Sequence, residues 1–304
     1  MNCPLCGKTI NNIITKEIRQ GKGIVYFCND CKLGILDNAY PKEFYIEDYR
    51  NEYGPMHRGT NPKEEFIVMS KLQEDRVKLV KQYIDKNKRL LDVGCSAGQF
   101  ISNISPYVKL ADGLEINEKF ALYASKMTNG LVYNSFDDLP KPGLYDCIVS
   151  FQTLEHVDNL FEFMNNIKEI LHSEGNVIIE VPNLNDALLS LYDLPEYDKT
   201  FYHKAHKWYF SDKSLMNLMD KCGFVGKIKY NQDFGMFNHL YWNILGHGQN
   251  NFKLGYHKLD DMKWKKLHIS NEIKMLFKDV EERYIDILKN RKMTSNITFI
   301  GELK

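Results

Sequence analysis

The chain has 304 residues, of which 43% are hydrophobic, and its 40 basic and 40 acidic side chains give a formal net charge of zero. This length is enough for one large α/β domain with a small appendage, and a neutral chain has no overall field that would draw it onto nucleic acid or an anionic membrane. No apolar run approaches the ~20 residues that span a bilayer, and the N-terminal letters lack a signal-peptide core, so we expect a cytoplasmic protein without a membrane span.

Four cysteines form two pairs near the N-terminus. Cys3 and Cys6 enclose two residues, as do Cys28 and Cys31, and a β-prone stretch (GIVYF, 23–27) lies between the pairs. In a reducing compartment such clusters indicate metal ligands before disulfides, and two such knuckles deliver four thiolates to one tetrahedral Zn²⁺. Residues 1–40 are therefore predicted to be a zinc ribbon that folds as a separate module, and the zinc is structural because four sulfurs leave no open position.

Residues 41–75 are rich in tyrosine and are punctuated by proline, asparagine and glycine, and a helical pattern begins near Lys63. This composition predicts a connector. Tyr45, Tyr49 and Tyr53 either close over a site as a lid or pack the ribbon onto the rest of the chain, and both interpretations stay open.

Strands and helices alternate from 76 to 230. Strands are predicted at 89–94, 109–116, 131–133, 145–151 and 176–182, with helices through residue 83, from 99, from 118 and over 160–171. A helix over 214–222, stopped by Gly223, and a strand ending at Tyr230 follow. The alternation predicts a mostly parallel sheet with helices on both faces.

A last strand, 296–303, lies in the final segment 294–304 and is far from its predecessor in sequence. A short turn would be enough to connect this strand to the one that ends at Tyr230, so the intervening residues 231–293 are predicted to be an insertion over the crevice of the sheet. It contains a long helix with one apolar face: Ile273, Leu276, Phe277, Val280, Tyr284, Ile287 and Leu288.

A glycine turn follows the first strand of the alternating region, in the letters LDVGCSAG. A strand that runs through such a turn into a helix presents backbone N–H groups to a ligand. The dinucleotide fingerprint G-x-G-x-x-G is absent, because Ser96 and Gln99 stand at its second and third glycines. The letters also spell the hydrolase pattern G-x-S-x-G, but that elbow follows several earlier strands, whereas this strand is the first of its sheet.

Glu115 ends the next strand, where an acidic side chain can accept both hydroxyl protons of a ribose. With LDVGCSAG, GLEI, NSFDDLP, YDCIVSFQTLEHV and NVIIEVPN in this order, residues 85–230 resemble the class I S-adenosylmethionine-dependent methyltransferases. The resemblance implies a Rossmann-like seven-stranded sheet and S-adenosylmethionine as cofactor. It assigns Asp92, Gly94 and Gly98 to the methionine portion, Glu115 to the ribose, Ser135 and Phe136 to the adenine, Gln152 to the sheet edge, and Ile116 to the cofactor site. The family often has Asp where this chain has Ser135, which places a strong bond to the adenine amine in doubt.

Methyl transfer to a hydroxyl needs a base near the cofactor. His203 and His206 follow the fifth strand, in HKAHKWYFS, which resembles the H-x-x-H-x-x-x-F-[ST] element of small-molecule methyltransferases. His206 is the first candidate base and His203 the second, since a neutral imidazole suits this task near pH 7. A metal site on these histidines lacks a third ligand that the sequence can assign, and His156 is expected near the cofactor or as a cap of the following turn.

The ribbon, the tyrosine-rich segment and the core together resemble bacterial methyltransferases that modify sugars or related metabolites. This implies O-methylation of a sugar-like hydroxyl on a small molecule, nucleotide-linked or in a polysaccharide. A sugar C-methyltransferase is an alternative, although its Tyr-x-Glu-His element reads HKAH here. A ribosomal RNA guanine methyltransferase with a zinc module is disfavoured by the zero net charge, despite a basic stretch at 263–266. A non-catalytic zinc-ribbon interaction protein is the remaining alternative, and a homodimer is left open.

Overall fold

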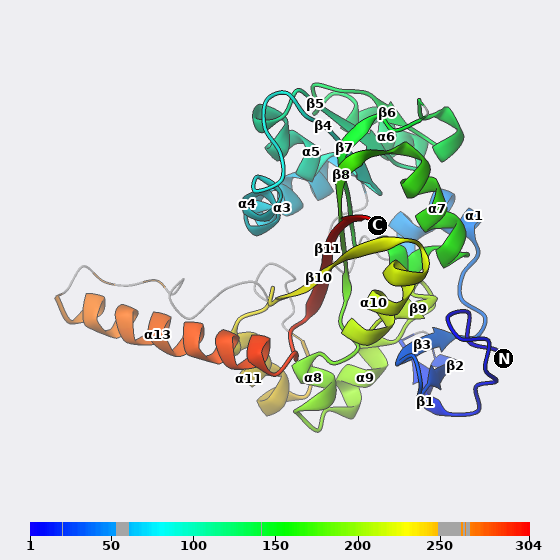
Figure 1. The fold of residues 1–304 in the computed structure, drawn as a ribbon. Helices are drawn as coiled ribbons and strands as arrows, with labels where there is room; N and C mark the ends of the chain where they lie inside the picture. Colours follow the sequence, from blue (N-terminus) through cyan, green and yellow to red (C-terminus); the bar gives the residue numbers. More distant parts are fainter. Residues whose placement is uncertain (20, 53–60, 141, 249–262, 264, 266–267) are drawn as a thin grey trace.

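The structure is a computed structural model that describes residues 1–19, 21–52, 61–140, 142–248, 263, 265 and 268–304. Seven strands form the central sheet in the order β10-β11-β8-β7-β4-β5-β6 (Figure 1). They are β4 (Arg89–Val93), β5 (Leu110–Leu114), β6 (Val132–Tyr133), β7 (Tyr145–Phe151), β8 (Leu171–Pro182), β10 (Phe224–Asn231) and β11 (Asn296–Leu303). The neighbours from β8 to β6 are parallel, whereas β11 is antiparallel to both β8 and β10. The predicted fold class is therefore confirmed.

Helices connect and cover these strands. The longer ones are α3 (Pro62–Met69), α4 (Glu74–Val80), α5 (Gln99–Ile104), α6 (Glu118–Ala124), α7 (Leu160–Ile170), α9 (Pro195–Phe201), α10 (Asp212–Lys221), α11 (Met236–Leu245) and α13 (His268–Asn290). Short elements are α1 (Lys42–Glu47), α8 (Ala187–Ser190) and the 3₁₀ turns η1 (Ser70–Leu72), η2 (Ser105–Tyr107), η3 (Phe136–Asp138) and η4 (Leu154–His156). Asparagine side chains cap the N-termini of three helices: Asn61 accepts from the N–H of Glu64 at α3, Asn117 from that of Phe120 at α6, and Asn159 caps α7.

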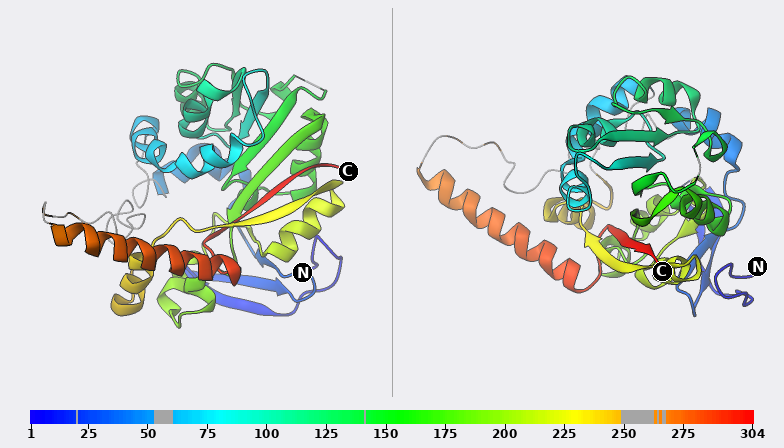
Figure 2. Two further views of the ribbon diagram at one scale, coloured as in Figure 1. Left: turned by 60° about the vertical axis from the view of Figure 1, so that its left-hand side comes forward. Right: turned by 45° about the horizontal axis from the view of Figure 1, so that its top comes forward.

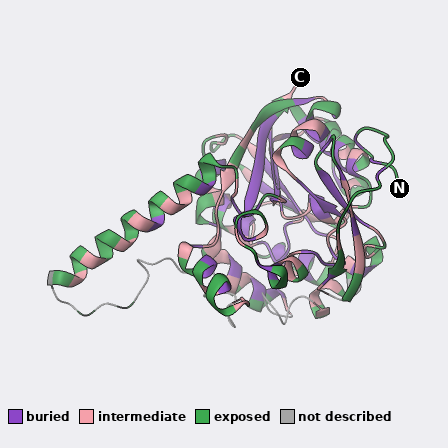
Figure 3. Ribbon diagram, turned by 90° about the horizontal axis from the view of Figure 1, so that it is seen from below, coloured by how far each residue is buried: buried purple, intermediate pink, exposed green. Residues whose placement is uncertain are grey.

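The sheet has one apolar layer on each face, because side chains alternate along a strand. In β4, Leu90 packs with α4 and α5, while Leu91 packs with α7 and α10. The first layer contains Leu79, Val80, Phe100, Ile101, Ile104, Cys147 and Ile178, and the second contains Ile148, Met164, Ile167, Val177, Leu215, Leu218 and Phe299. This central core is drawn as buried in Figure 3.

The N-terminal ribbon shares its sheet with a strand from outside residues 1–40. Its strands β1 (Ile13–Ile18), β2 (Gly21–Cys28) and β3 (Leu33–Leu36) form a sheet with β9 (Trp208–Tyr209), a strand from the predicted core (Figure 2). The pairing places Gly34 opposite Tyr209, and the backbone N–H groups of Leu36 and Tyr40 donate to carbonyls of Lys207 and Lys204. The pairing gives β3, otherwise an edge strand with unpaired backbone groups, the partners that β9 offers. Folding of residues 1–40 as a separate module stays a prediction.

The segment between β10 and β11 lies only partly against the body. Helix α11 packs Trp242 onto the buried residues Leu194 and Tyr197, while α13 projects away from the sheet (Figures 1 and 2). The predicted apolar face of α13 is therefore incompletely buried, and Leu276 and Ile287 are more than half exposed. No helix among the described residues is long and apolar enough to cross a membrane.

Candidate active site

A crevice of about 1620 Å³ opens at the carboxyl ends of the parallel strands. Its walls come from the glycine turn after β4, the end of β5, η3, the loop after β7, the 203–206 loop and the connector. A cavity for one drug-sized ligand measures about 300–1,000 Å³. The crevice therefore has room for a cofactor and a second molecule.

The glycine turn is fixed by contacts that exclude side chains. Gly94 has φ +85°, and a Cβ there would lie 2.2 Å from Thr153 Oγ1; Gly98 has φ +83°, and its Cβ would lie 3.0 Å from Ala124 Cα. Only glycine adopts such backbone at these distances without strain. The N–H groups of Gly94 and Cys95 donate to Leu114 O. These two donors stabilise the turn itself rather than face a ligand, which differs from the sequence-based expectation.

Glu115 closes the turn from the next strand. Its Oε2 accepts from the backbone N–H of Ser96 and its Oε1 from that of Asn117, both at 2.9 Å. Burial raises the pKa of the Glu115 carboxyl, and the guanidinium of Arg50, 3.8 Å away, opposes this shift. A carboxylate accepts about four hydrogen bonds. Glu115 can therefore accept further donors from a ligand in the crevice that it lines.

Arg50 and Glu65 are site residues that the sequence did not reveal. Arg50 Nη1 lies 2.7 Å from Glu65 Oε2, and its Nη2 donates to Ser96 Oγ at 2.9 Å. The Ser96 hydroxyl donates in turn to Glu65 Oε1 at 2.6 Å. Arg50 also lies over the ring of Phe120, 4.2 Å from its centroid. The connector thus places a buried ion pair against the glycine turn, a contact that no local pattern signals.

The remaining predicted cofactor residues divide into two groups. Ile116, Ser135, Phe136 and Gln152 line the crevice, as do Gly94 and Glu115. Phe136 is held edge-on to Phe163, and Ser135 Oγ donates to Asp138. Asp92 and Gly98 do not line the crevice. Burial raises the pKa of Asp92 to about 7, against the effect of Arg76, and direct contact between Asp92 and a cofactor stays a prediction.

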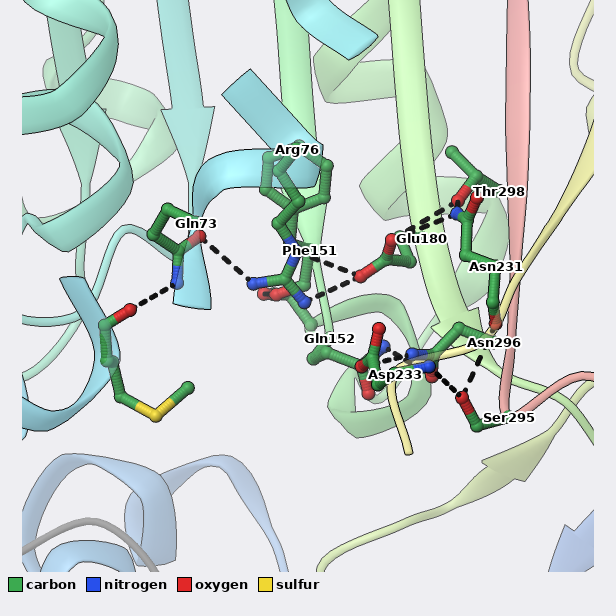
Figure 4. Close-up of polar contacts among 12 residues, drawn as sticks. Gln73, Arg76, Phe151, Gln152, Glu180, Asn231, Asp233, Ser295, Asn296 and Thr298 are labelled. Atoms are coloured by element: carbon green, nitrogen blue, oxygen red, sulfur yellow. Dashed lines mark hydrogen bonds and ion pairs between the residues drawn. The ribbon is translucent and has the colours of Figure 1, made fainter. Parts of the chain in front are cut away.

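A polar network occupies another wall of the crevice, where β8 and β10 end and β11 begins (Figure 4). Arg76 donates to Glu180 Oε1 at 2.6 Å, and Asn231 donates to Glu180 Oε2 at 3.2 Å. Gln152 Nε2 donates to Asn296 Oδ1, and Asn296 Nδ2 donates to Asp233. Burial, with Glu180 nearby, raises the pKa of Asp233 to about 6. This wall offers charged and amide groups rather than an apolar surface.

Both candidate bases lie in the same crevice, in a cluster with two residues after β7. The rings of His203 and His206 are 3.9 Å apart, and those of His206 and His156 are 4.8 Å apart. Glu155 Oε1 lies 3.9 Å from His156 Nε2 and 4.0 Å from His206 Nε2. His156 is thus a wall residue of the crevice and not only part of a turn.

The connector and the ribbon hold this cluster in place. Tyr45 and Tyr49 both pack edge-on against His156, with ring centroids 5.2 and 5.7 Å away, and the Tyr45 hydroxyl donates to Ala205 O. The N–H of Lys207 donates to Glu155 O at 2.9 Å. These two tyrosines therefore line the crevice. Tyr53, the third tyrosine of the predicted lid, lies outside the described residues.

The four ribbon cysteines come together as the spacing predicts. The Sγ atoms of Cys3, Cys6, Cys28 and Cys31 all lie within 4.8 Å of one another, and none of these cysteines is in a disulfide. The Cys6 and Cys28 sulfurs are 3.7 Å apart, which matches the edge of about 3.8 Å of a tetrahedron with 2.3 Å Zn–S bonds. The donor set therefore fits a structural zinc ion.

Comparisons with known proteins agree with this geometry. A sequence profile described as a methyltransferase domain matches residues 68–226, more than half of the chain. The ubiquinone biosynthesis O-methyltransferase of Rickettsia typhi is 29% identical over 139 residues, 43% of this chain and 53% of that protein, and the Rickettsia prowazekii protein of the same name is 30% identical over 141 residues, 43% and 52%. The chain spans about half the length of the curated relatives it matches.

Two solved methyltransferase structures align with most of this chain. A possible histamine N-methyltransferase from Thermotoga maritima has 20% identity and a TM-score of 0.49, covering 86% of this chain and 98% of that one. An S-adenosylmethionine-dependent methyltransferase from Archaeoglobus fulgidus has 17% identity and a TM-score of 0.49, covering 77% and 94%.

Proposed function

This chain belongs to the methyltransferase domain family, the class I S-adenosylmethionine-dependent methyltransferases, and we propose that it transfers the cofactor's methyl group to a hydroxyl oxygen of a polar small molecule. The observation that carries the proposal is the meeting of Glu115 with the histidine cluster in one crevice. Glu115 can bind the cofactor, and the histidines can remove a proton from the acceptor. Cofactor binding and proton removal are the two requirements of O-methylation.

In the proposed cofactor complex, Glu115 accepts the ribose hydroxyls, with Ile116 beside it. Phe136 and Ser135 flank the adenine, and Phe136 keeps its orientation through Phe163. The methionine portion follows the glycine turn, near Gln152. S-adenosylmethionine supplies a sulfonium methyl group with a good leaving group, so most of the rate enhancement comes from positioning.

We propose a sugar-like acceptor, free, nucleotide-linked or within a polysaccharide. The wall formed by Arg76, Glu180, Asn231, Asp233 and Asn296 supports this choice, because its groups can hydrogen-bond several hydroxyls. The names of the Rickettsia relatives support transfer to oxygen. The relatives are named for ubiquinone biosynthesis, and the second candidate acceptor is a phenolic hydroxyl on an aromatic ring.

The reaction joins the acceptor oxygen to the methyl carbon as the C–S bond breaks and its electron pair returns to sulfur. The hydroxyl proton must leave, and His206 and His203 are the proposed recipients. His206 lies beside the carboxylate of Glu155, which would stabilise an imidazolium. A positioned base contributes about 10²–10⁴-fold to the rate.

The four cysteines are proposed to hold one structural Zn²⁺. It would stabilise the knuckles of the ribbon, whose strand β3 pairs with β9 immediately after the histidines. The zinc would therefore act on the active site indirectly, by fixing the backbone that carries His203 and His206.

Turnover of labelled cofactor tests the proposal. Protein with methyl-labelled S-adenosylmethionine would be offered nucleotide sugars, oligosaccharides, catechols and RNA in parallel. We expect S-adenosylhomocysteine and a methyl ether on the sugar acceptors, and a His206→Ala variant with kcat lower by about 10²–10⁴-fold but cofactor affinity within a few-fold. Label in RNA or on a carbon or nitrogen atom would overturn O-methylation, and label confined to catechols would replace the sugar acceptor by the second candidate.

A further inference from the structure

The Glu155, His156 and His206 side chains bring three metal-binding atoms to one point of the crevice wall. One carboxylate oxygen and two imidazole nitrogens lie within 4.8 Å of one another. Glu155 Oε1 is central, 3.9 Å from His156 Nε2 and 4.0 Å from His206 Nε2. A six-coordinate or tetrahedral ion with 2.1 Å bonds separates its ligands by about 3.0–3.4 Å. The three atoms therefore need to move together by less than about 1 Å to share an ion.

The orientation of the rings also matches a metal site. His156 Nδ1 is 2.6 Å from Ala205 O, so this nitrogen carries the hydrogen and the lone pair of the neutral ring lies on Nε2, which faces Glu155. A metal-bound histidine almost always donates its other N–H to a backbone carbonyl or carboxylate in this way. Packing by Tyr45 and Tyr49 fixes the ring further.

The burial of the carboxylate is a separate observation. Glu155 is 1% exposed, and a buried carboxylate is stable when paired or bound to a cation. His156 and His206 retain partial exposure, with 15% of each side chain accessible. All three residues line the crevice, so an ion held by them would keep coordination positions open to an acceptor.

We infer that Glu155, His156 and His206 bind one divalent first-row transition metal ion at the acceptor end of the crevice, separate from the zinc of the ribbon. Two imidazoles and one carboxylate suit Zn²⁺, Fe²⁺, Co²⁺ or Mn²⁺ better than Mg²⁺, which prefers oxygen ligands. The ribbon site has a closed set of four thiolates and a structural role, whereas this set has three ligands, as catalytic metal sites do.

The chemical role of the ion rests on the proposed O-methylation. The acceptor hydroxyl is a further ligand, and coordination makes its proton more acidic. A metal-bound His206 has no free lone pair on Nε2, so of the two proposed proton recipients it is His203, with its ring 3.9 Å from that of His206, that takes the proton. The acceptor oxygen bonds to the methyl carbon, the C–S bond breaks, and the proton passes from His203 to water.

Metal binding can be measured without turnover. The full-length protein, with its ribbon saturated by one equivalent of zinc, would be titrated with Mn²⁺, and free Mn²⁺ followed by electron paramagnetic resonance. Mn²⁺ is the probe because thiolates hold it poorly. We expect one Mn²⁺ per chain, and at least a tenfold weaker affinity in Glu155→Gln, His156→Ala and His206→Ala. His172→Ala, which changes an exposed histidine on β8, should bind Mn²⁺ as the wild type does.

Circular dichroism and S-adenosylmethionine affinity identify any variant that fails to fold, and the two single histidine variants provide independent tests. Absence of Mn²⁺ binding to the wild type, or equal binding by folded His206→Ala and His172→Ala, overturns the inference. Specific Mn²⁺ binding without methylation of any hydroxyl acceptor leaves the metal site intact and refutes the proposed function. Methylation of a hydroxyl acceptor by a protein that does not bind Mn²⁺ overturns the metal site and leaves the proposed function intact.

Discussion

Glu115→Gln is the most direct test of the cofactor site. Each oxygen of the Glu115 carboxylate accepts a backbone N–H at 2.9 Å, one from Ser96 and one from Asn117. A glutamine amide has one oxygen and one NH₂ group. Whichever way it is oriented, one of the two backbone N–H groups would face another donor, and the ribose hydroxyls would lose a charged acceptor.

The size of the effect follows from these contacts. A hydrogen bond to a charged group contributes about 1.5–3 kcal/mol, which corresponds to about 10- to 150-fold in affinity. We expect this loss for S-adenosylmethionine and S-adenosylhomocysteine alike, because both carry the ribose. The raised pKa of the Glu115 carboxyl adds a pH dependence: wild-type affinity should fall as acid protonates the side chain, and the Gln variant should lack this step.

Isothermal titration calorimetry with S-adenosylhomocysteine measures the loss, and thermal melting verifies that the variant is folded. Glu118→Gln is the matched control, since Glu118 is exposed in the first turn of α6. An affinity of folded Glu115→Gln within twofold of wild type, with Glu118→Gln also unchanged, would refute the assignment of Glu115 to the ribose.

Three other changes test the turn, the buried acid and the ribbon. Asp92→Asn should gain stability relative to wild type as the pH rises from about 4 to 7, as measured by urea denaturation. The pKa of Asp92 is about 7 in the folded chain against the ordinary value of 3.8, so ionisation of Asp92 destabilises the folded wild type over this range. A difference in unfolding free energy that does not change with pH would contradict this. Gly98→Ala should lose about 1–3 kcal/mol of stability from left-handed strain plus contact with Ala124, whereas Gly246→Ala, with similar φ and no atom of the described residues within 4 Å, should lose only about 1 kcal/mol. Equal losses would show that the contact with Ala124 relaxes freely. Cys3→Ser should abolish stoichiometric zinc by elemental analysis and lower kcat through the β3–β9 pairing, with cofactor affinity within a few-fold; unchanged kcat in a zinc-free variant would show that the ribbon does not fix the histidine loop.

The strands and the cofactor motif could be predicted from the sequence because their signals are local. The predicted strands at 145–151 and 296–303 coincide with β7 and β11, and the helix predicted from residue 99 begins there as α5. Alternating apolar residues, a glycine turn and an acid after the next strand each lie within a short window, and short-range sterics and burial decide their structure. The cysteine spacing was equally informative, since each knuckle is formed by neighbours in the chain.

The histidine cluster illustrates what the sequence did not provide. The sequence assigned no third ligand to a metal on His203 and His206, whereas the structure groups His206 with Glu155 and His156 from the loop after β7. Likewise, no pattern links Arg50 to Glu65 and Ser96, or the ribbon to β9.

The sequence by itself thus determined the sheet, the glycine turn with its acidic partner and the cysteine set, because each depends on residues within one or two adjacent elements. Only the tertiary structure decided which loops meet above the sheet. Those contacts join segments that are distant in the chain. Their geometry depends on the order of the strands in the sheet, and on which backbone and charged groups still lack a hydrogen-bond or ion-pair partner once the helices and strands have packed.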